Sequence, residues 1–249
     1  MKNIRLVIEY DGGRYDGWQK QPSRKNTVSI QEKIEEVLSR MEEGEEISLI
    51  GGARTEPGAH AIMQIANFGT NSTKKMYEIK HYLNRYLPRD IAIRQVDEVP
   101  ERFHSAFSAK KFVYEYRVET GEYASVFSRK YRYYCFGKPE LARMEEAAKK
   151  LLGKHDFKGY SDNKRMKKST ERNMFDIRFE QEEGGFKMVF TADDFWPHMV
   201  RILAGTLLAI GLGEKNADAI DHIFEEGKRE LAGEALDVKG LFLREIIYE

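Results

Sequence analysis

This sequence of 249 residues has only one cysteine, no cluster of histidines and no net charge. The single cysteine, Cys135, excludes an internal disulfide and a cysteine-based zinc site, and it favours a reducing compartment. The six histidines are dispersed without metal-ligand spacing, so we predict no metal. The sequence has 41 basic residues (lysine and arginine) and 41 acidic residues (aspartate and glutamate), so its net charge is zero. Any binding of nucleic acid must therefore come from local clusters of basic residues.

Long apolar runs are absent as well. No run approaches the roughly 20 residues that a membrane-spanning helix needs. The N-terminus leads directly into the alternating pattern of a strand rather than into the apolar core of a signal peptide. We therefore expect a cytoplasmic protein that does not insert into a membrane. The length allows one large domain or two moderate ones, and we favour two.

Strand and helix patterns alternate along the chain. Period-two alternation predicts strands over 4–10, 62–68, 91–99 and 112–118, and a hairpin that joins 173–181 to 186–192. Apolar residues at helical spacing predict helices over 30–41, from near Lys74 to Leu87, from Pro139 to Leu152 and over 195–210. Ser29 and Glu32 form a capping box before the first of these, and Asn216 is expected to cap a further helix. A closing strand begins near Gly240.

Glycine is concentrated in a charged turn that lies between two short apolar stretches. Three glycines between residues 51 and 58 permit backbone conformations that a side chain would forbid. Pro57 fixes its own φ and pushes the preceding residue toward an extended shape. The turn can therefore hold Arg54, Glu56 and His60 at the exposed edge of a sheet. An ordinary hairpin loop with charged tips in water explains the same pattern, and local residues do not separate the two interpretations.

This turn resembles a signature of the tRNA pseudouridine synthase A family, Arg-Thr-Asp-Ala-Gly-Val-His-Ala followed by a glutamine. The residues that carry the likeness are Arg54-Thr55-Glu56-Pro57-Gly58-Ala59-His60-Ala61 and Gln64. In the family the aspartate is the catalytic carboxylate. This chain has Glu56 at that place and Pro57 where alanine is usual.

Further motifs similar to those of the family follow in order from Glu9 to Leu243. Residues 9–19 resemble its Glu-Tyr-Asp-Gly…Gly-Trp-Gln opening. Residues 103–116 resemble its Phe-His-Ala-Arg-Phe-Ser-Ala…Tyr-x-Tyr motif, where Tyr114 matches the active-site tyrosine and Tyr116 is expected in the core. Residues 195–201 resemble its Phe-x-x-His-Met-Val-Arg motif, where Arg201 matches the arginine that pairs with the catalytic carboxylate.

The resemblance implies an α/β protein, of the α+β kind, with two halves around a mixed, largely antiparallel sheet and a central cleft. We expect an N-terminal half over 1–104 that carries Glu56 and a C-terminal half over 105–249 that carries Tyr114 and Arg201. The implied activity is a cofactor-free isomerisation of uridine to pseudouridine in the tRNA anticodon stem-loop, at tRNA positions 38–40. The resemblance also implies a homodimer that binds tRNA across both subunits.

Each matched residue has an implied role. Glu56 stabilises or traps the cleaved sugar or attacks the base, Arg201 keeps Glu56 ionised, and Tyr114 stacks on the base. Contacts to RNA are expected from Arg14, Arg54, His60, Lys110 and Lys111, and from Lys164, Arg165, Lys167 and Lys168 in a basic segment over 158–172. A solvated loop is the alternative for that segment. A solvated helix face is the favoured interpretation of the cations between Lys74 and Arg89, and contact with RNA phosphates is the less favoured alternative.

The glutamate leaves three hypotheses open. Glu56 is the working carboxylate, or the chain binds tRNA with catalysis lost or impaired, or Glu56 is a variant residue in an otherwise ordinary enzyme. The extra methylene moves the carboxylate oxygens by roughly 1 Å, and a displacement of that order can lose on the order of a hundredfold in rate. An alternative from a different class is an RNA-folding protein that uses the same cleft without isomerising anything.

Overall fold

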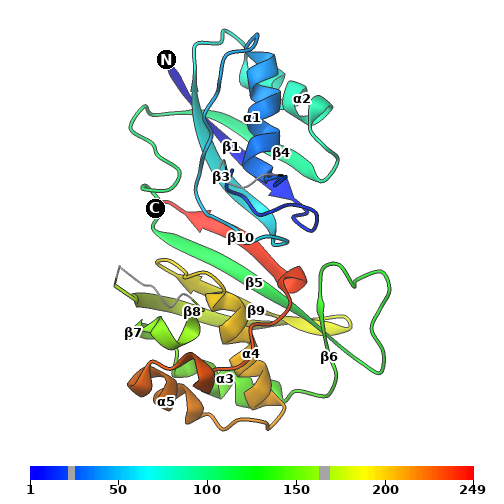
Figure 1. The fold of residues 1–249 in the computed structure, drawn as a ribbon, viewed down its shortest axis with the longest axis vertical. Coiled ribbons are helices and arrows are strands. Elements are labelled where there is room, and N and C mark those ends of the chain that lie inside the picture. The colour runs from blue at the N-terminus through cyan, green and yellow to red at the C-terminus, as the bar shows by residue number, and fades with distance from the viewer. Residues whose placement is uncertain (22–25, 163–168) are drawn as a thin grey trace. The chain divides into compact units, whose positions relative to one another are not determined.

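The computed structural model describes residues 1–21, 26–162 and 169–249, and it divides into two compact units. Unit 1 comprises Met1–Lys110 and Leu243–Glu249, and unit 2 comprises Lys111–Phe242 (Figure 1). The border thus lies after Lys110 rather than after residue 104, and the C-terminus returns to unit 1. Asn67 Oδ1 accepts hydrogen bonds from the Ser105 amide and hydroxyl at 2.9 and 2.7 Å, which holds the chain beyond residue 104 in unit 1.

Unit 1 is a sheet covered by two helices. Strand β1 (Lys2–Tyr10) pairs antiparallel with β3 (His60–Thr70) and β4 (Ile91–Val99), and the short β2 (Ile50–Gly51) pairs antiparallel with β3. Strand β10 (Leu241–Ile247), from Leu243 onward part of unit 1, joins the other side of β3. Helix α2 (Met76–Tyr86) packs on β4 and contacts α1 (Ile30–Met41) (Figure 1). Fully buried apolar side chains from β1 and α1 form the core, among them Ile4, Leu6, Ile8, Ile30, Ile34 and Leu38.

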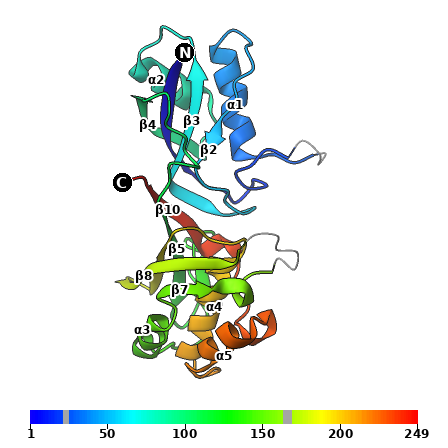
Figure 2. The same ribbon diagram turned by 90° about the vertical axis from the view of Figure 1, so that its left-hand side faces the viewer.

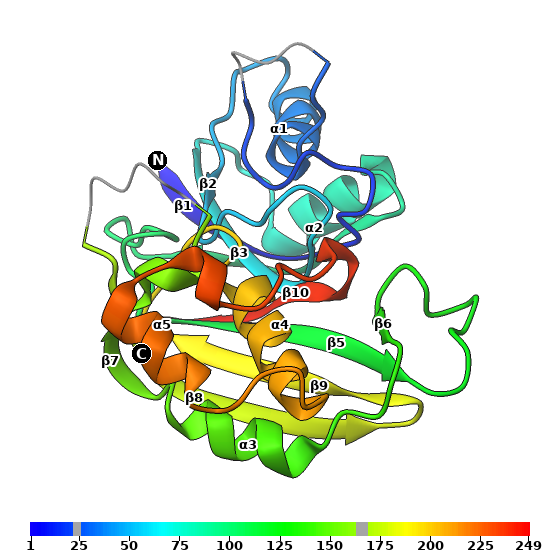
Figure 3. The same ribbon diagram turned by 60° about the horizontal axis from the view of Figure 1, so that its bottom comes forward.

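Unit 2 contains a set of mostly antiparallel strands with helices on one side. Its strands are β5 (Lys111–Thr120), β9 (Gly185–Ala192), β8 (Glu171–Glu182) and β7 (Gly153–Asp156), in that order. The short β6 (Tyr133–Cys135) pairs parallel with β5. Strands β7 and β8 lie side by side in Figure 2. Helices α3 (Leu141–Lys149), α4 (Met199–Gly211) and α5 (Ala219–Glu226) lie on the same side of this sheet (Figure 3).

The fold class predicted from the sequence, α/β with a largely antiparallel sheet, is confirmed. Helix α1 and strand β4 have the predicted bounds, and Ser29 Oγ accepts the Glu32 amide at 3.2 Å as the capping box requires. The predicted first residues of two helices were wrong. Helix α4 begins at Met199 rather than at Phe195, because His198 has a φ of 66° that ends the preceding turn, and α5 begins after Asp218 rather than after Asn216. Within the three described segments, no helix is long and apolar enough to cross a membrane.

Candidate active site

A buried glutamine holds the Gly-rich turn between β2 and β3. Gln64 is fully buried, its Oε1 accepts the Ala53 amide at 3.1 Å, and its Nε2 donates to the Ala53 carbonyl at 2.8 Å. Two residues further on, the Thr55 hydroxyl and the Tyr10 hydroxyl form a buried hydrogen bond of 2.7 Å. The backbone on either side of Arg54 is therefore fixed by the interior of unit 1.

The loop that follows β1 packs directly against the backbone of the same turn. Gly12 lies so close to Ala59 that a Cβ on Gly12 would be 1.8 Å from the Ala59 carbonyl oxygen. Gly17 has a φ of +88°, and a Cβ there would be 2.6 Å from the Thr55 carbonyl oxygen. No side chain fits at either position without moving the turn. The turn is thus held by the interior on one side and by a backbone contact on the other.

The catalytic candidate projects from this framework. Thr55 and Ala59 are buried, Arg54 and Pro57 are exposed, and Glu56 is half-buried between them. The Ala59 amide donates to the Glu56 carbonyl at 3.0 Å, which closes a tight turn directly after the acid. Glu56 therefore stands at the boundary between the protein interior and solvent, two residues after the exposed Arg54.

His60 was expected to contact RNA, but its side chain is only 2% exposed. Its Nδ1 lies 3.1 Å from the Gly12 amide nitrogen and 3.1 Å from Asp11 Oδ1, both in the loop that follows β1. The contacts of His60 support a positioning role, in which it holds the Gly12 loop against the turn.

Arg14 is exposed but already faces a carboxylate. Its guanidinium forms an ion pair with Asp90 and donates to Asp90 Oδ1 at 3.1 Å. The Tyr15 hydroxyl donates to the same oxygen at 2.7 Å, and burial together with this hydrogen bond raises the pKa of Tyr15 to about 12. An RNA phosphate at Arg14 would have to compete with Asp90.

The tyrosine and the arginine of the family motifs lie in unit 2. Tyr114, on β5, is 9% exposed and meets the ring of Phe195 edge to face at a centroid distance of 5.2 Å. Tyr116 is fully buried, as expected for a core residue, and its hydroxyl donates to the Asp237 carbonyl at 2.6 Å. Arg201, in the first turn of α4, is half-buried, and its Nε donates to the Leu236 carbonyl at 2.5 Å. Both candidate side chains are therefore oriented by fixed partners within unit 2.

Of the remaining basic candidates, the structure describes only Lys110 and Lys111. Lys110 is exposed at the end of unit 1, and the Lys111 ammonium lies over the Phe175 ring at 4.5 Å from its centroid. Lys164, Arg165, Lys167 and Lys168 lie outside the described residues. In the described parts of the chain, no three His, Cys, Asp or Glu side chains gather as a metal site.

A cluster that the sequence analysis missed anchors the start of α4. Asp162 Oδ2 lies 2.7 Å from His198 Nδ1, and Asp162 Oδ1 accepts the Arg229 Nε hydrogen at 2.8 Å. Burial acts to raise the pKa of Asp162, but the hydrogen bonds from His198 and Arg229 outweigh it and lower the pKa. His198 lies in the quoted motif three residues before Arg201, whereas nothing local in the sequence marks Asp162 or Arg229.

An α/β fold of this kind, with an acid on a Gly-rich turn, is that of a pseudouridine synthase. The model of the tRNA pseudouridine synthase family matches residues 6–108 and 147–249. The chain is 41% identical over 248 residues to a tRNA pseudouridine synthase A of Bacillus sp. (strain KSM-64), and 38% identical over 248 residues to that of Acetivibrio thermocellus, with full coverage of both chains. It is 39% identical over 246 residues, 99% of each chain, to a tRNA pseudouridine synthase A 2 of Bacillus anthracis.

The chain therefore belongs to the tRNA pseudouridine synthase family, and it is an isomerase that converts uridine to pseudouridine.

Replacement of Asp162 by asparagine tests the anchor of α4. Because the pKa of folded Asp162 lies below its ordinary value, its stabilising contribution is complete above about pH 4 and disappears as the pH falls through the folded pKa. Asp162→Asn should lower the unfolding midpoint at neutral pH, and the gap to the native chain should narrow below about pH 4. Thermal unfolding between about pH 3 and pH 7 measures this.

The matched control is Asp176→Asn, which removes a surface ion pair to Arg178 of 2.7 Å and should change the midpoint little. A gap between Asp162→Asn and the native chain that stays constant over the whole pH range contradicts the assignment.

Proposed function

We propose that this chain acts on uridines of the tRNA anticodon stem-loop, at tRNA positions 38–40, with Glu56 as its working carboxylate. The observation that carries the proposal is the position of Glu56, half-buried on a turn whose backbone is fixed by Gln64 and by the Gly12 loop. The stem-loop specificity rests on the family resemblance. The tRNA substrate and the single cysteine support a cytoplasmic location.

The reaction needs no cofactor and no oxidant. The bond between uracil N1 and ribose C1′ breaks, the base turns, and a bond forms between C5 and C1′. The proton on C5 is lost and N1 gains one, so the atoms and electrons balance within the nucleotide. The Glu56 carboxylate supplies a negative charge or a nucleophile at the cleaved bond.

Three further side chains receive roles from the motifs that they match. Tyr114 stacks on the base and is a candidate for moving the C5 proton, and its buried ring with a fixed Phe195 contact suits a rigid stacking partner. Arg201 keeps the catalytic carboxylate ionised. Arg54, exposed one residue before Thr55, contacts the RNA backbone or occupies the place of the extruded base.

The glutamate is compatible with this site for a steric reason. Its extra methylene advances the carboxylate by roughly 1 Å, and the turn that carries it has its own departure from the family at Pro57. Proline restricts the backbone of the residue before it, so the two departures fall on adjacent residues that set one side chain's position. We propose that Pro57 compensates for the longer side chain.

Release of tritium from tRNA labelled at C5 of uridine tests Glu56. The native chain should release tritium, Glu56→Ala should lose release by at least about a thousandfold while it binds tRNA with the native Kd, and Glu56→Asp should retain activity. Glu46→Ala, an exposed glutamate of the same unit, is the matched control and should behave as the native chain.

Two results contradict the proposal: native release by Glu56→Ala, or an inert Glu56→Asp on tRNA that it binds. A native chain that binds tRNA without release, and binds equally well after the change, is an RNA-binding protein without the isomerase step.

We also propose a homodimer, supported by a projecting aromatic segment between β5 and β6. Tyr123, Val126 and Phe127 of this segment are 79%, 64% and 92% exposed, and an exposed group of large apolar side chains is typical of an interaction site. The buried Glu119 holds this segment in shape, since its two carboxylate oxygens accept from the Ser125 amide and the Ser128 hydroxyl, each at 2.8 Å.

Sedimentation at micromolar concentration should give a dimer for the native chain, and Phe127→Ser should shift it toward monomer because the exposed ring is lost from the interface. A native chain that sediments as a monomer contradicts the proposal.

A further inference from the structure

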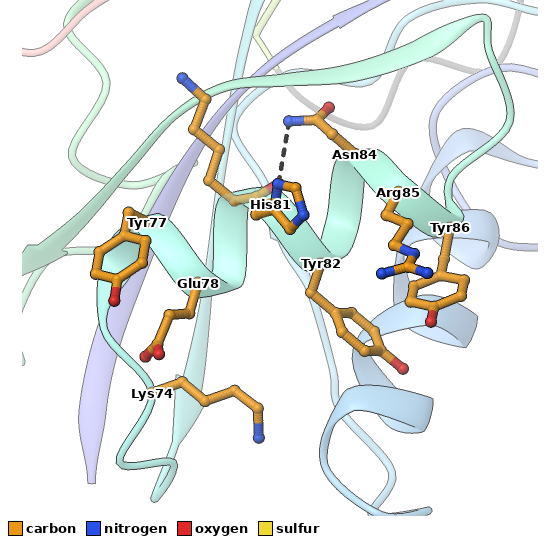
Figure 4. A pocket seen from close by; sticks show the side chains of 9 residues that line it. Lys74, Tyr77, Glu78, His81, Tyr82, Asn84, Arg85 and Tyr86 are labelled. Atoms are coloured by element: carbon orange, nitrogen blue, oxygen red, sulfur yellow. Dashed lines mark hydrogen bonds between the residues drawn. The ribbon is translucent and has the colours of Figure 1, made fainter.

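The outward side of helix α2 carries a hollow of about 660 Å³ that the catalytic motifs do not include. We define the α2 surface by six residues that line this hollow: Lys74, Tyr77, Lys80, Tyr82, Arg85 and Tyr86. The rings of Tyr82 and Tyr86 lie together at the C-terminal end of the helix, with the Arg85 guanidinium beside them, whereas Tyr77 stands at the N-terminal end (Figure 4). Three rings and three cations thus line this hollow, and they come from one 11-residue helix and the residues just before it.

Two of the three rings of the α2 surface are exposed, and Tyr82 is half-buried. Tyr77 is 64% exposed and Tyr86 is 47% exposed. The Tyr82 and Tyr86 centroids are 4.6 Å apart, and the Arg85 guanidinium lies 5.6 Å from the Tyr86 centroid. The two rings are tilted by 50° to each other, so each offers its own face beside the guanidinium. Bases of single-stranded or looped RNA stack on such aromatic rings and on guanidinium planes.

Two cations of the α2 surface differ from those on other helices in their ion pairing. On α1, Lys33 pairs with Glu36 at 2.9 Å, and on α3, Lys149 pairs with Glu146 at 2.5 Å. Within the described residues, neither Lys80 nor Arg85 forms such an ion pair.

The one acidic residue of α2 does not supply a counter-charge to them. Glu78 instead accepts the Lys75 amide at 2.7 Å and thereby caps the start of the helix. In a chain of zero net charge, the α2 surface is therefore a local excess of positive charge.

We propose that the α2 surface is an RNA-binding surface that contacts tRNA outside the nucleotide that is modified. Lys80 and Arg85 contact phosphates, and the exposed tyrosine rings stack on unpaired bases. The identity of the RNA as tRNA rests on the proposed function. The positive charge and the exposed rings of the α2 surface are observations that do not depend on that function. A second copy of the chain fits less well, since a two-fold interface at this surface places Lys80 and Arg85 against the same cations of the partner.

The experiment measures the Kd for a full-length tRNA transcript at several salt concentrations with the full chain. Lys80→Gln combined with Arg85→Gln should weaken binding about tenfold at ~0.1 M salt, and it should reduce the slope of log Kd against log salt by about 0.7 to 0.9 for each phosphate that the variant no longer neutralises. Both residues are exposed, so the fold should be retained, and the unfolding midpoint checks this.

The matched control is Arg143→Gln combined with Lys149→Gln on α3, where each cation already pairs with a nearby carboxylate. Its Kd and salt slope should equal those of the native chain. Tyr77→Ala should weaken binding roughly fivefold or more and leave the salt slope unchanged, because stacking releases no counterions.

Native Kd and salt slope in Lys80→Gln/Arg85→Gln overturn the proposal, and so does a changed oligomeric state with tRNA affinity unchanged, which would identify a protein interface. Tritium release separates this result from the proposed function. If the α2 variants weaken binding in a chain that releases no tritium, the α2 surface stands and the proposal that Glu56 is the working carboxylate fails. If the native chain releases tritium and the α2 variants bind tRNA with the native Kd, the proposed function stands and the α2 surface proposal fails.

Discussion

The candidate active site depends on one contact, in which the backbone of Gly12 packs against the backbone of Ala59. A side chain at residue 12 would reach to 1.8 Å from the Ala59 carbonyl oxygen, so the two segments can approach only because residue 12 is glycine. His60 adds a hydrogen bond to the Gly12 amide at 3.1 Å. Two stretches that are far apart in the sequence thereby form one rigid support, and Glu56 stands on it.

Side chains replace strand pairing where the sheet stops. Strand β2 has only two residues, and the Gly52 amide makes a last backbone hydrogen bond to the Ile65 carbonyl at 2.7 Å. From there the buried Gln64 takes the place of a neighbouring strand, since it bonds both polar groups of Ala53. A buried polar group without a partner costs about 1–3 kcal/mol, so this substitution lets the chain leave the sheet and turn without that cost.

The sequence was sufficient where the information is local. Helix α1 and strand β4 were predicted with their observed bounds, because the capping box and the apolar periods lie within the elements themselves. The strand β6 was missed because its three residues are defined by a parallel partner, β5, rather than by a period. The buried state of His60 and the cluster around Asp162 were missed for the same reason, since their partners lie 48 and 36 or more residues away.

The central claim is that a fixed turn backbone puts Glu56 in its working position, and the single-turnover rate of pseudouridine formation in Gly12→Ala tests it most directly. The same methyl group at Gly13 would meet only the Asp11 side chain at 3.1 Å and, more distantly, the His60 ring at 4.0 Å, so Gly13→Ala is the control. With tRNA saturating and both variants folded, Gly12→Ala should lose on the order of a hundredfold in rate and Gly13→Ala should lose little. Equal rates in the two folded variants would contradict the claim.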